Sequence, residues 1–391
     1  ALCHSPNYNF KGEAYYDSTH HLEEANMDPE FDHLATFPSQ QIADRHSALA
    51  TQIVETLRKM HRSKKNGKKK GKGKKAPPKE SHTSDETQER SIENDAEKPD
   101  RISETEAQLI SAIRIRTCNP GVDPSLAELT VGRPYADAMK KVYMKYPNDA
   151  EVVYCYAESL MVLHAWQLYE YPTGKPLSED VPIVREVLET ALKQHLGHAG
   201  ICHLYVHLSE MSANPGQALG ACKYLRSDFP ECGHLIHMAT HVDVLVGDYE
   251  SCVRYNYLAI EADEKAVRDV PETAGVVSFY FGYIAHNYHM LVYGAILGGM
   301  EQIALDMAEQ LNKHLTEQTF VDHPGLIDYL ETYASLDIHI LIRFGRWQQI
   351  LELESPKDSH LMMYRAATLC YARGLAHANL GDTDAAKVEA A

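Results

Sequence analysis

The sequence has no run of about 18 apolar residues, so it predicts no helix that spans a membrane. It also lacks the glycine-rich loops of nucleotide and dinucleotide sites, the GxSxG turn of serine hydrolases and the HExxH helix of zinc proteases. Its eight cysteines form no CxxC pair and no dense framework. Scattered cysteines of this kind indicate reduced, mostly buried thiols, which favour the cytoplasm. No signal peptide is visible, and the compartment stays open.

Basic residues are scarce outside one segment. The formal charge is -17, yet the stretch from Arg58 to Lys79 holds 12 of the 38 Lys and Arg and no acid. The remainder carries 38 − 12 = 26 basic against 55 acidic residues, a balance of -29. We therefore expect the folded part to bind no nucleic acid.

Composition along the chain predicts three parts. Residues 63–101 contain almost no apolar side chains, and a basic block in them is followed by an acidic and polar one. Such a segment cannot bury enough surface to offset its ordering entropy, so we expect a disordered linker, with a nuclear address or an RNA-contacting tail as alternatives. On either side we expect an N-terminal helical part (1–62) and a longer helical part (102–391).

The pattern beyond residue 101 is helical and gives no strand signals. Ser103 and Glu106 form a capping box ahead of an apolar run. Apolar residues then recur at spacings of three and four, which predicts helices over 135–146, 149–169, 181–195 and 199–212. The sequence therefore predicts an all-α protein.

A glycine-centred turn recurs in this helical part, at Gly216, Gly247, Gly299, Gly345 and Gly381. A unit of helix, turn and helix about 34 residues long is typical of tetratricopeptide repeats. The longer intervals predict loop insertions at Asp263–Gly275 and Glu317–Gly325. We expect stacked antiparallel helix pairs that form an α-solenoid.

Histidine is unusually common, with 22 residues in the chain. Counted back from the turn glycines, many of them fall 13, 10 or 6 residues before the turn, which places them on one stripe of each first helix. Imidazole suits Zn, Cu, Fe or Ni, and eight ligands exceed one tetrahedral site, so two ions are conceivable. Buried core histidines, or a polar groove for a peptide or an anion, are the alternatives. The predicted metal ligands are His203, His207, Glu210, His234, His237, His241, His286 and His289.

One acid stands inside an otherwise apolar helix. Burial of Glu158 in YCYAESLMVL would raise its pKa and suit it to proton transfer, which makes it our candidate catalytic residue. A carboxylate paired with a nearby Lys or Arg is the alternative.

The stretch from His198 to Asn256 resembles the signature HxYxHxxE…GHLxHMxxH of a histidine-rich family of tetratricopeptide-repeat proteins. Ala199 and Ala239 stand where the signature has prolines. PNYN at Pro6 resembles another motif of the family, whose first repeats would precede it. The resemblance implies the repeat fold, and it implies that the motif histidines form a site.

These observations favour a metal-dependent enzyme that acts on a small molecule in the concave groove, with one or two copper, iron or zinc ions per chain. An oxidoreductase is favoured over a hydrolase, because ligation dominated by histidine suits copper or iron oxidants. The alternative is a scaffold without catalytic activity that binds a partner peptide through the solenoid surface.

Overall fold

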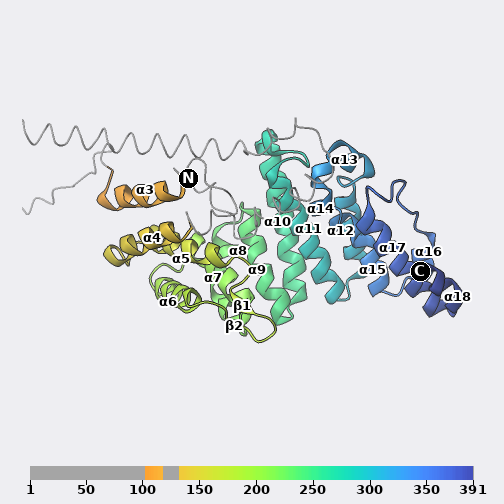
Figure 1. The fold of residues 1–391 in the computed structure, drawn as a ribbon, viewed down its shortest axis with the longest axis horizontal. Helices are drawn as coiled ribbons and strands as arrows, with labels where there is room; N and C mark the ends of the chain where they lie inside the picture. Colours follow the sequence, from red (N-terminus) through yellow and green to blue (C-terminus); the bar gives the residue numbers. More distant parts are fainter. Residues whose placement is uncertain (1–101, 118–131, 391) are drawn as a thin grey trace, which may run out of the picture. The chain divides into compact units, whose positions relative to one another are not determined.

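The structure is a computed structural model that describes residues 102–117 and 132–390. Most of these residues are helical (Figure 1), which confirms the all-α class predicted from the sequence. The one sheet of the described residues is a short antiparallel pair, β1 (Tyr169–Glu170) and β2 (Lys175–Pro176). Residues 1–62 and 63–101, and with them the predicted linker, lie outside the described residues.

The α-helices follow one another along the chain, with short 3-10 helices between some of them. The α-helices are α3 (Glu104–Thr117), α4 (Arg133–Lys145), α5 (Ala150–Met161), α6 (Asp180–Leu192), α7 (Ala199–Glu210), α8 (Leu219–Asp228), α9 (Gly233–Val246), α10 (Tyr249–Asp269), α11 (Phe279–Leu297), α12 (Glu301–Asn312), α13 (Glu317–Asp322), α14 (Ile327–Leu330), α15 (Leu336–Arg343), α16 (Trp347–Glu352), α17 (Met363–Leu380) and α18 (Thr383–Glu389). The 3-10 helices are η5 (Val162–His164), η6 (Pro215–Ala218), η7 (Pro271–Thr273), η8 (Pro324–Leu326) and η9 (Tyr333–Ser335).

The described chain divides into two compact units. The first contains α3 to η5 and the beginning of α6, and its α3 begins with the predicted capping box. Glu106 donates its backbone N–H to the Ser103 hydroxyl at 3.1 Å, and Ser103 donates its own to the Glu106 carboxylate at 2.6 Å. The helix predicted over 149–169 is wrong in its second half, since α5 ends at Met161. Beyond η5, the backbone at Trp166 takes a left-handed φ of 61°, which a continuing helix excludes.

The second unit contains the β1–β2 pair, the rest of α6 and every helix from α7 onward. Consecutive helices from α7 to α12 pack against one another, and alternate ones also touch, α7 against α9 and α9 against α11. Buried apolar side chains of α11 and α12, including Leu291, Ala304 and Leu311, belong to one core cluster of this unit. This packing brings three histidine-bearing helices, α7, α9 and α11, alongside one another.

Four of the five predicted glycine turns are present. Gly247, Gly299, Gly345 and Gly381 have φ values of 84°, 74°, 66° and 90°, which side chains other than glycine rarely adopt. Gly216 differs, because it lies within the 3-10 helix η6. The proline before it favours a new helical turn at this point.

The predicted loop insertions are largely wrong. α10 continues as far as Asp269, so the first half of the segment from Asp263 to Gly275 is helix. The segment from Glu317 to Gly325 forms α13 and most of η8. Thr316 caps α13, because its side chain accepts a hydrogen bond from the Thr319 backbone N–H. The additional residues in the longer intervals between the glycine turns therefore form mainly helix rather than loops. Within residues 102–117 and 132–390, no helix is both long and apolar enough to cross a membrane.

Candidate metal centre

The helices α7 and α9 present their histidines from equivalent positions. α7 begins after His198, whose Nδ1 accepts the Ile201 N–H at 3.2 Å, and α9 begins at Gly233. Counted from these starts, His203 and His237 are each the fifth residue of their helix. The register counted back from the turn glycines, which paired His203 with His234, is therefore wrong. The reason is that five residues, 211–215, separate α7 from Gly216, whereas α9 runs directly into Gly247.

Gly233 is needed where α9 begins because an acidic side chain of α10 approaches it closely. A Cβ at this position would lie 2.1 Å from the Asp263 carboxylate oxygen. That buried carboxylate also accepts hydrogen bonds from the Tyr280 hydroxyl at 2.6 Å and from the Asn287 amide at 2.5 Å. The contacts tie the beginning of α9 to α10 and α11, so the histidines of α9 are held in a fixed position.

His237 and His241 of α9 converge with His286 of α11. One ligand nitrogen from each of the three lies within 4.8 Å of the others, an arrangement that can hold a metal ion. The Nε2 atoms of His237 and His241 are 2.9 Å apart. His237 is fully buried, and its ring centroid lies 4.6 Å from that of His286. These three residues, all predicted ligands, form the first triad.

Hydrogen bonds on the far side of two of these rings fix their tautomers. Asn256 donates its amide N–H groups to the Thr240 hydroxyl and the Cys252 carbonyl, at 2.9 and 2.8 Å. Its carbonyl oxygen therefore faces His237 Nδ1, at 2.7 Å, and accepts a proton from it. His241 Nδ1 lies 2.5 Å from Glu210 Oε2, and it donates because a carboxylate only accepts. Both rings therefore carry their hydrogen on Nδ1.

The two facing Nε2 atoms are consequently both lone-pair acceptors. In neutral rings no hydrogen lies between them, and their contact at 2.9 Å is repulsive unless a cation joins them. Burial, reinforced by His286 and His241, holds the pKa of His237 well below its usual value, so an extra proton is disfavoured. A bound metal ion satisfies both lone pairs.

The distance between the Nε2 atoms of His237 and His241 also suits coordination of one metal ion. With metal–nitrogen bonds of about 2.0–2.1 Å, two ligands of one ion have nitrogens about 2.9–3.4 Å apart for bond angles of about 90–110°. The pair on α9 falls at the lower end of this range. The three histidines therefore fit a transition-metal ion in two respects: a cation would satisfy the two facing lone pairs, and the nitrogen separation matches that of two ligands of one ion.

Glu210, also predicted as a ligand, engages ring nitrogens with both of its oxygens. His207 Nδ1 lies 2.7 Å from Oε1, and His241 Nδ1 lies 2.5 Å from Oε2. Burial acts to raise the pKa of this carboxyl, but His241 and His207 outweigh it and hold the pKa well below its usual value. Here the ionised carboxylate orients two imidazoles, as acids behind metal-ligating histidines commonly do.

The remaining predicted histidines lie in the same unit. His203 and His207 of α7 and His234 of α9 form a second triad, in which His203 Nε2 is 3.1 Å from His207 Nε2 and 3.2 Å from His234 Nε2. His289 stands apart, with its ring 6.2 Å from His286 and 5.2 Å from Tyr333.

Four of the histidines of this region have lowered pKa values. Burial lowers the pKa of His234 and of His286 to about 3, and that of His289 to about 4. Burial, together with its histidine neighbours, also holds the pKa of His203 well below its usual value. Neutral imidazole is the form that binds metal, so these rings are prepared for an ion across the physiological range.

Glu158 belongs to the first unit, where it forms a buried ion pair. Its carboxylate accepts a hydrogen bond from Arg116 at 3.0 Å, and Arg116 also lies 5.0 Å from the centre of the Tyr135 ring. The paired carboxylate, the alternative left open by the sequence, is present. A catalytic role for Glu158 stays a prediction.

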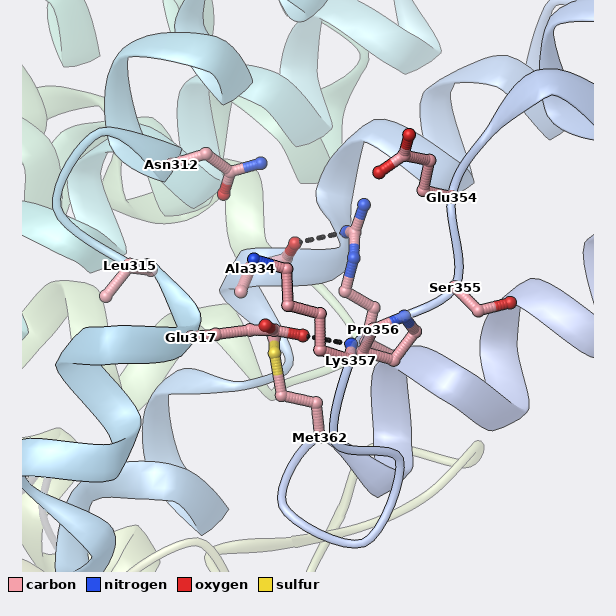
Figure 2. A pocket seen from close by; sticks show the side chains of 10 residues that line it. Asn312, Leu315, Glu317, Ala334, Glu354, Ser355, Pro356, Lys357 and Met362 are labelled. Atoms are coloured by element: carbon pink, nitrogen blue, oxygen red, sulfur yellow. Dashed lines mark hydrogen bonds between the residues drawn. The ribbon is translucent and has the colours of Figure 1, made fainter.

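A separate pocket lies among residues of α12, α13 and α17 (Figure 2). Two of its charged side chains, Arg365 and Glu317, have hydrogen-bond partners. Arg365 donates to Asp337 at 2.7 and 2.9 Å, and Glu317 accepts the Lys357 backbone N–H at 2.5 Å. No predicted metal or catalytic residue lines this pocket, so it plays no part in the metal centre.

Asn256, which sets the tautomer of His237, was not among the predicted site residues. It is fully buried on the stripe of α10 that also carries Cys252, Ala259 and Asp263. Polar side chains on the same stripe as Cys252 and Ala259 are the sequence signal that points to it.

Comparison with known proteins adds no assignment. No protein-family model matches the sequence, and no curated protein shows significant similarity to it.

Proposed function

We propose that this protein is a metalloprotein in which the first triad, His237, His241 and His286, holds a transition-metal ion. The observation that carries the proposal is the contact between the Nε2 atoms of His237 and His241, 2.9 Å apart and both hydrogen-bond acceptors. Asn256 and Glu210 fix this state from behind the rings. A satisfied core histidine would instead meet a donor or a solvent molecule at Nε2.

Three imidazole ligands suit copper, iron or zinc. Metal centres with three protein ligands leave a coordination position for a substrate or water, which is the usual arrangement of catalytic rather than structural ions. We therefore propose an enzyme that acts on a small molecule bound at this position.

Redox chemistry is the favoured reaction class. Hydrolysis at a metal usually needs a free acid or base beside the bound water. Glu210, the carboxylate that contacts these imidazoles, has both oxygens occupied by His207 and His241. With Glu210 engaged in this way, ligation by three histidines favours copper or iron as an oxidant over zinc as a hydrolytic centre in this proposal.

The repeat architecture belongs to the same proposal. Contacts of α7 with α9, and of α9 with α11, are those expected when the first helices of stacked pairs line one surface of an α-solenoid. The resemblance to histidine-rich tetratricopeptide-repeat proteins suggests the same arrangement. The second candidate function, a peptide-binding scaffold, draws on this architecture alone.

Metal analysis tests the proposal. The full chain, grown with copper, iron and zinc supplements, should carry stoichiometric metal, and His286→Gln should lose the ion of the first triad while its circular dichroism stays helical. His339→Gln, which changes a half-buried histidine of α15 outside both triads, is the matched control. A metal-free wild type whose melting temperature does not respond to added Cu, Fe or Zn would contradict the proposal and favour the scaffold.

A further inference from the structure

The pocket among α12, α13 and α17 (Figure 2) has a volume of about 270 Å³, and no residue of the first triad lines it. Part of its wall is apolar, formed by the buried side chains of Leu315, Ala334 and Met362. Sites for drug-sized ligands have volumes of about 300–1,000 Å³. This pocket therefore suits a smaller molecule that has an apolar part.

Two charged side chains of the pocket are held by the protein itself. Arg365 donates to the Ala334 carbonyl at 2.6 Å and to the two oxygens of Asp337 at 2.7 and 2.9 Å. One oxygen of Glu317 accepts the Lys357 backbone N–H at 2.5 Å, which ties the loop after α16 to the beginning of α13. These contacts fix the shape of the pocket.

Three other polar groups of the pocket have no partner among the residues that the structure describes. The Glu354 carboxylate and the Lys357 ammonium both line the pocket, yet they form no ion pair with each other or with another described residue. The third group is Asn312 Oδ1, which is buried and accepts no hydrogen bond. A buried carbonyl oxygen without a donor is unfavourable, and a ligand with an N–H group would satisfy it.

An anionic and a cationic side chain that share one pocket without pairing are complementary to a molecule that carries both charges. An ammonium group of the ligand would donate to Glu354 and to Asn312 Oδ1, and a carboxylate of the ligand would accept from Lys357. The apolar wall would cover a hydrocarbon side chain. An α-amino acid with an aliphatic side chain combines these three features in a small molecule.

We propose that this pocket binds a free amino acid with an aliphatic side chain, through Glu354, Lys357 and Asn312. A ligand with a single charge would leave either the carboxylate or the ammonium of the pocket without a partner. The inference goes beyond the proposed function and does not rest on it, because no metal takes part in this site.

Isothermal titration calorimetry on the full chain tests the proposal, with millimolar L-leucine, isopentylamine and isocaproate as probes. Isopentylamine lacks the carboxylate of leucine, and isocaproate lacks its ammonium group. We expect leucine to bind and each analogue to bind about three- to tenfold more weakly, because both charged side chains of the pocket are exposed and each contributes a modest, solvent-screened contact.

Substitutions assign each charge of the ligand to its partner. Glu354→Gln should weaken the binding of leucine and isopentylamine but not of isocaproate, whereas Lys357→Met should weaken the binding of leucine and isocaproate but not of isopentylamine. Asn312→Ala should act as Glu354→Gln does. Glu352→Gln, which changes an exposed acid at the end of α16 outside the pocket, is the matched control and should bind leucine as the wild type does. Circular dichroism verifies folding, and Glu354 and Lys357 are exposed, so their variants should keep the helical signal.

Three results would overturn the proposal. Isopentylamine or isocaproate that binds as tightly as leucine would show a site for a single charge. Leucine binding that Glu354→Gln and Lys357→Met both leave unchanged would show that leucine binds elsewhere. No binding of leucine to the folded wild type would refute the proposal outright. Metal content is measured separately, so each of these failures leaves the proposed function of the first triad untouched.

Discussion

Replacing Glu210 with glutamine tests how the carboxylate supports the centre. Glutamine keeps the size of the side chain but has one acceptor oxygen and one donor nitrogen. The oxygen can accept from His207 or from His241, and the amide N–H₂ must face the other ring. That ring then has to present a lone pair at Nδ1, so its hydrogen moves to Nε2 and it ceases to be a metal ligand.

The magnitude follows from the two contacts that change. Both are charge-assisted, at 2.7 and 2.5 Å, and both are largely shielded from solvent. Loss of such support behind a metal-ligating histidine typically weakens metal affinity 10- to 100-fold. This corresponds to about 1.4–2.7 kcal/mol of binding free energy.

Competition with a chromophoric chelator, using Zn²⁺ and the full chain, measures this loss. We expect Glu210→Gln to weaken one bound ion within that range. Glu189→Gln, which changes a half-exposed glutamate of α6, should bind as the wild type does. Wild-type affinity for every bound ion in Glu210→Gln would refute the argument that the carboxylate sets ring tautomers.

Three further predictions concern pH, the second tautomer-setting residue and the core. In the metal-free protein, His234 and His286 have pKa values lowered to about 3 from 6.5, so the unfolded chain binds more protons in acid. The free energy of unfolding should then be fully retained above about pH 6.5 and fall by about 2 kcal/mol per such histidine by pH 5, measured by urea denaturation; a flat profile would contradict their burial as neutral rings. Asn256→Ala removes the acceptor behind His237 and should weaken metal binding about 10- to 100-fold in the same chelator assay, whereas unchanged affinity would show that this hydrogen bond does not matter. Ile236→Ala, at a buried apolar position of α9, should lower the free energy of unfolding by about 2–5 kcal/mol without changing the number of bound ions, and a loss of metal would mean that packing rather than ligation controls the site.

The helical class and the histidine pairs are readable from the sequence because both are local properties. His203 and His207, like His237 and His241, are four residues apart, and this spacing places them on one helix face whatever the surroundings. The capping box at Ser103 is equally local, and the structure contains it.

The register between helices is not local, and there the sequence reading is wrong. Counting from Gly216 assumes that the turn follows the helix directly. The chain instead places residues 211–215 between α7 and Gly216, and because α9 is also longer than α7, the correspondence between the two helices shifts by three residues. Only the positions where the helices begin reveal that His203 corresponds to His237.

The supporting residues depend on contacts between helices that are distant in sequence. Asn256 meets His237 across 19 positions, and a pattern of spacings within one helix carries no information about that contact. For the same reason the sequence suggests Glu210 as a ligand, whereas its oxygens lie on the Nδ1 atoms of two rings.

Anomalous X-ray diffraction from crystals of the metal-loaded full chain, recorded on both sides of the absorption edge of the bound metal, tests the central claim most directly. The account predicts an anomalous peak about 2.0–2.1 Å from the Nε2 atoms of His237 and His241, with His286 as the third ligand. An anomalous map with no peak at these three histidines, from protein shown to contain metal, would contradict it.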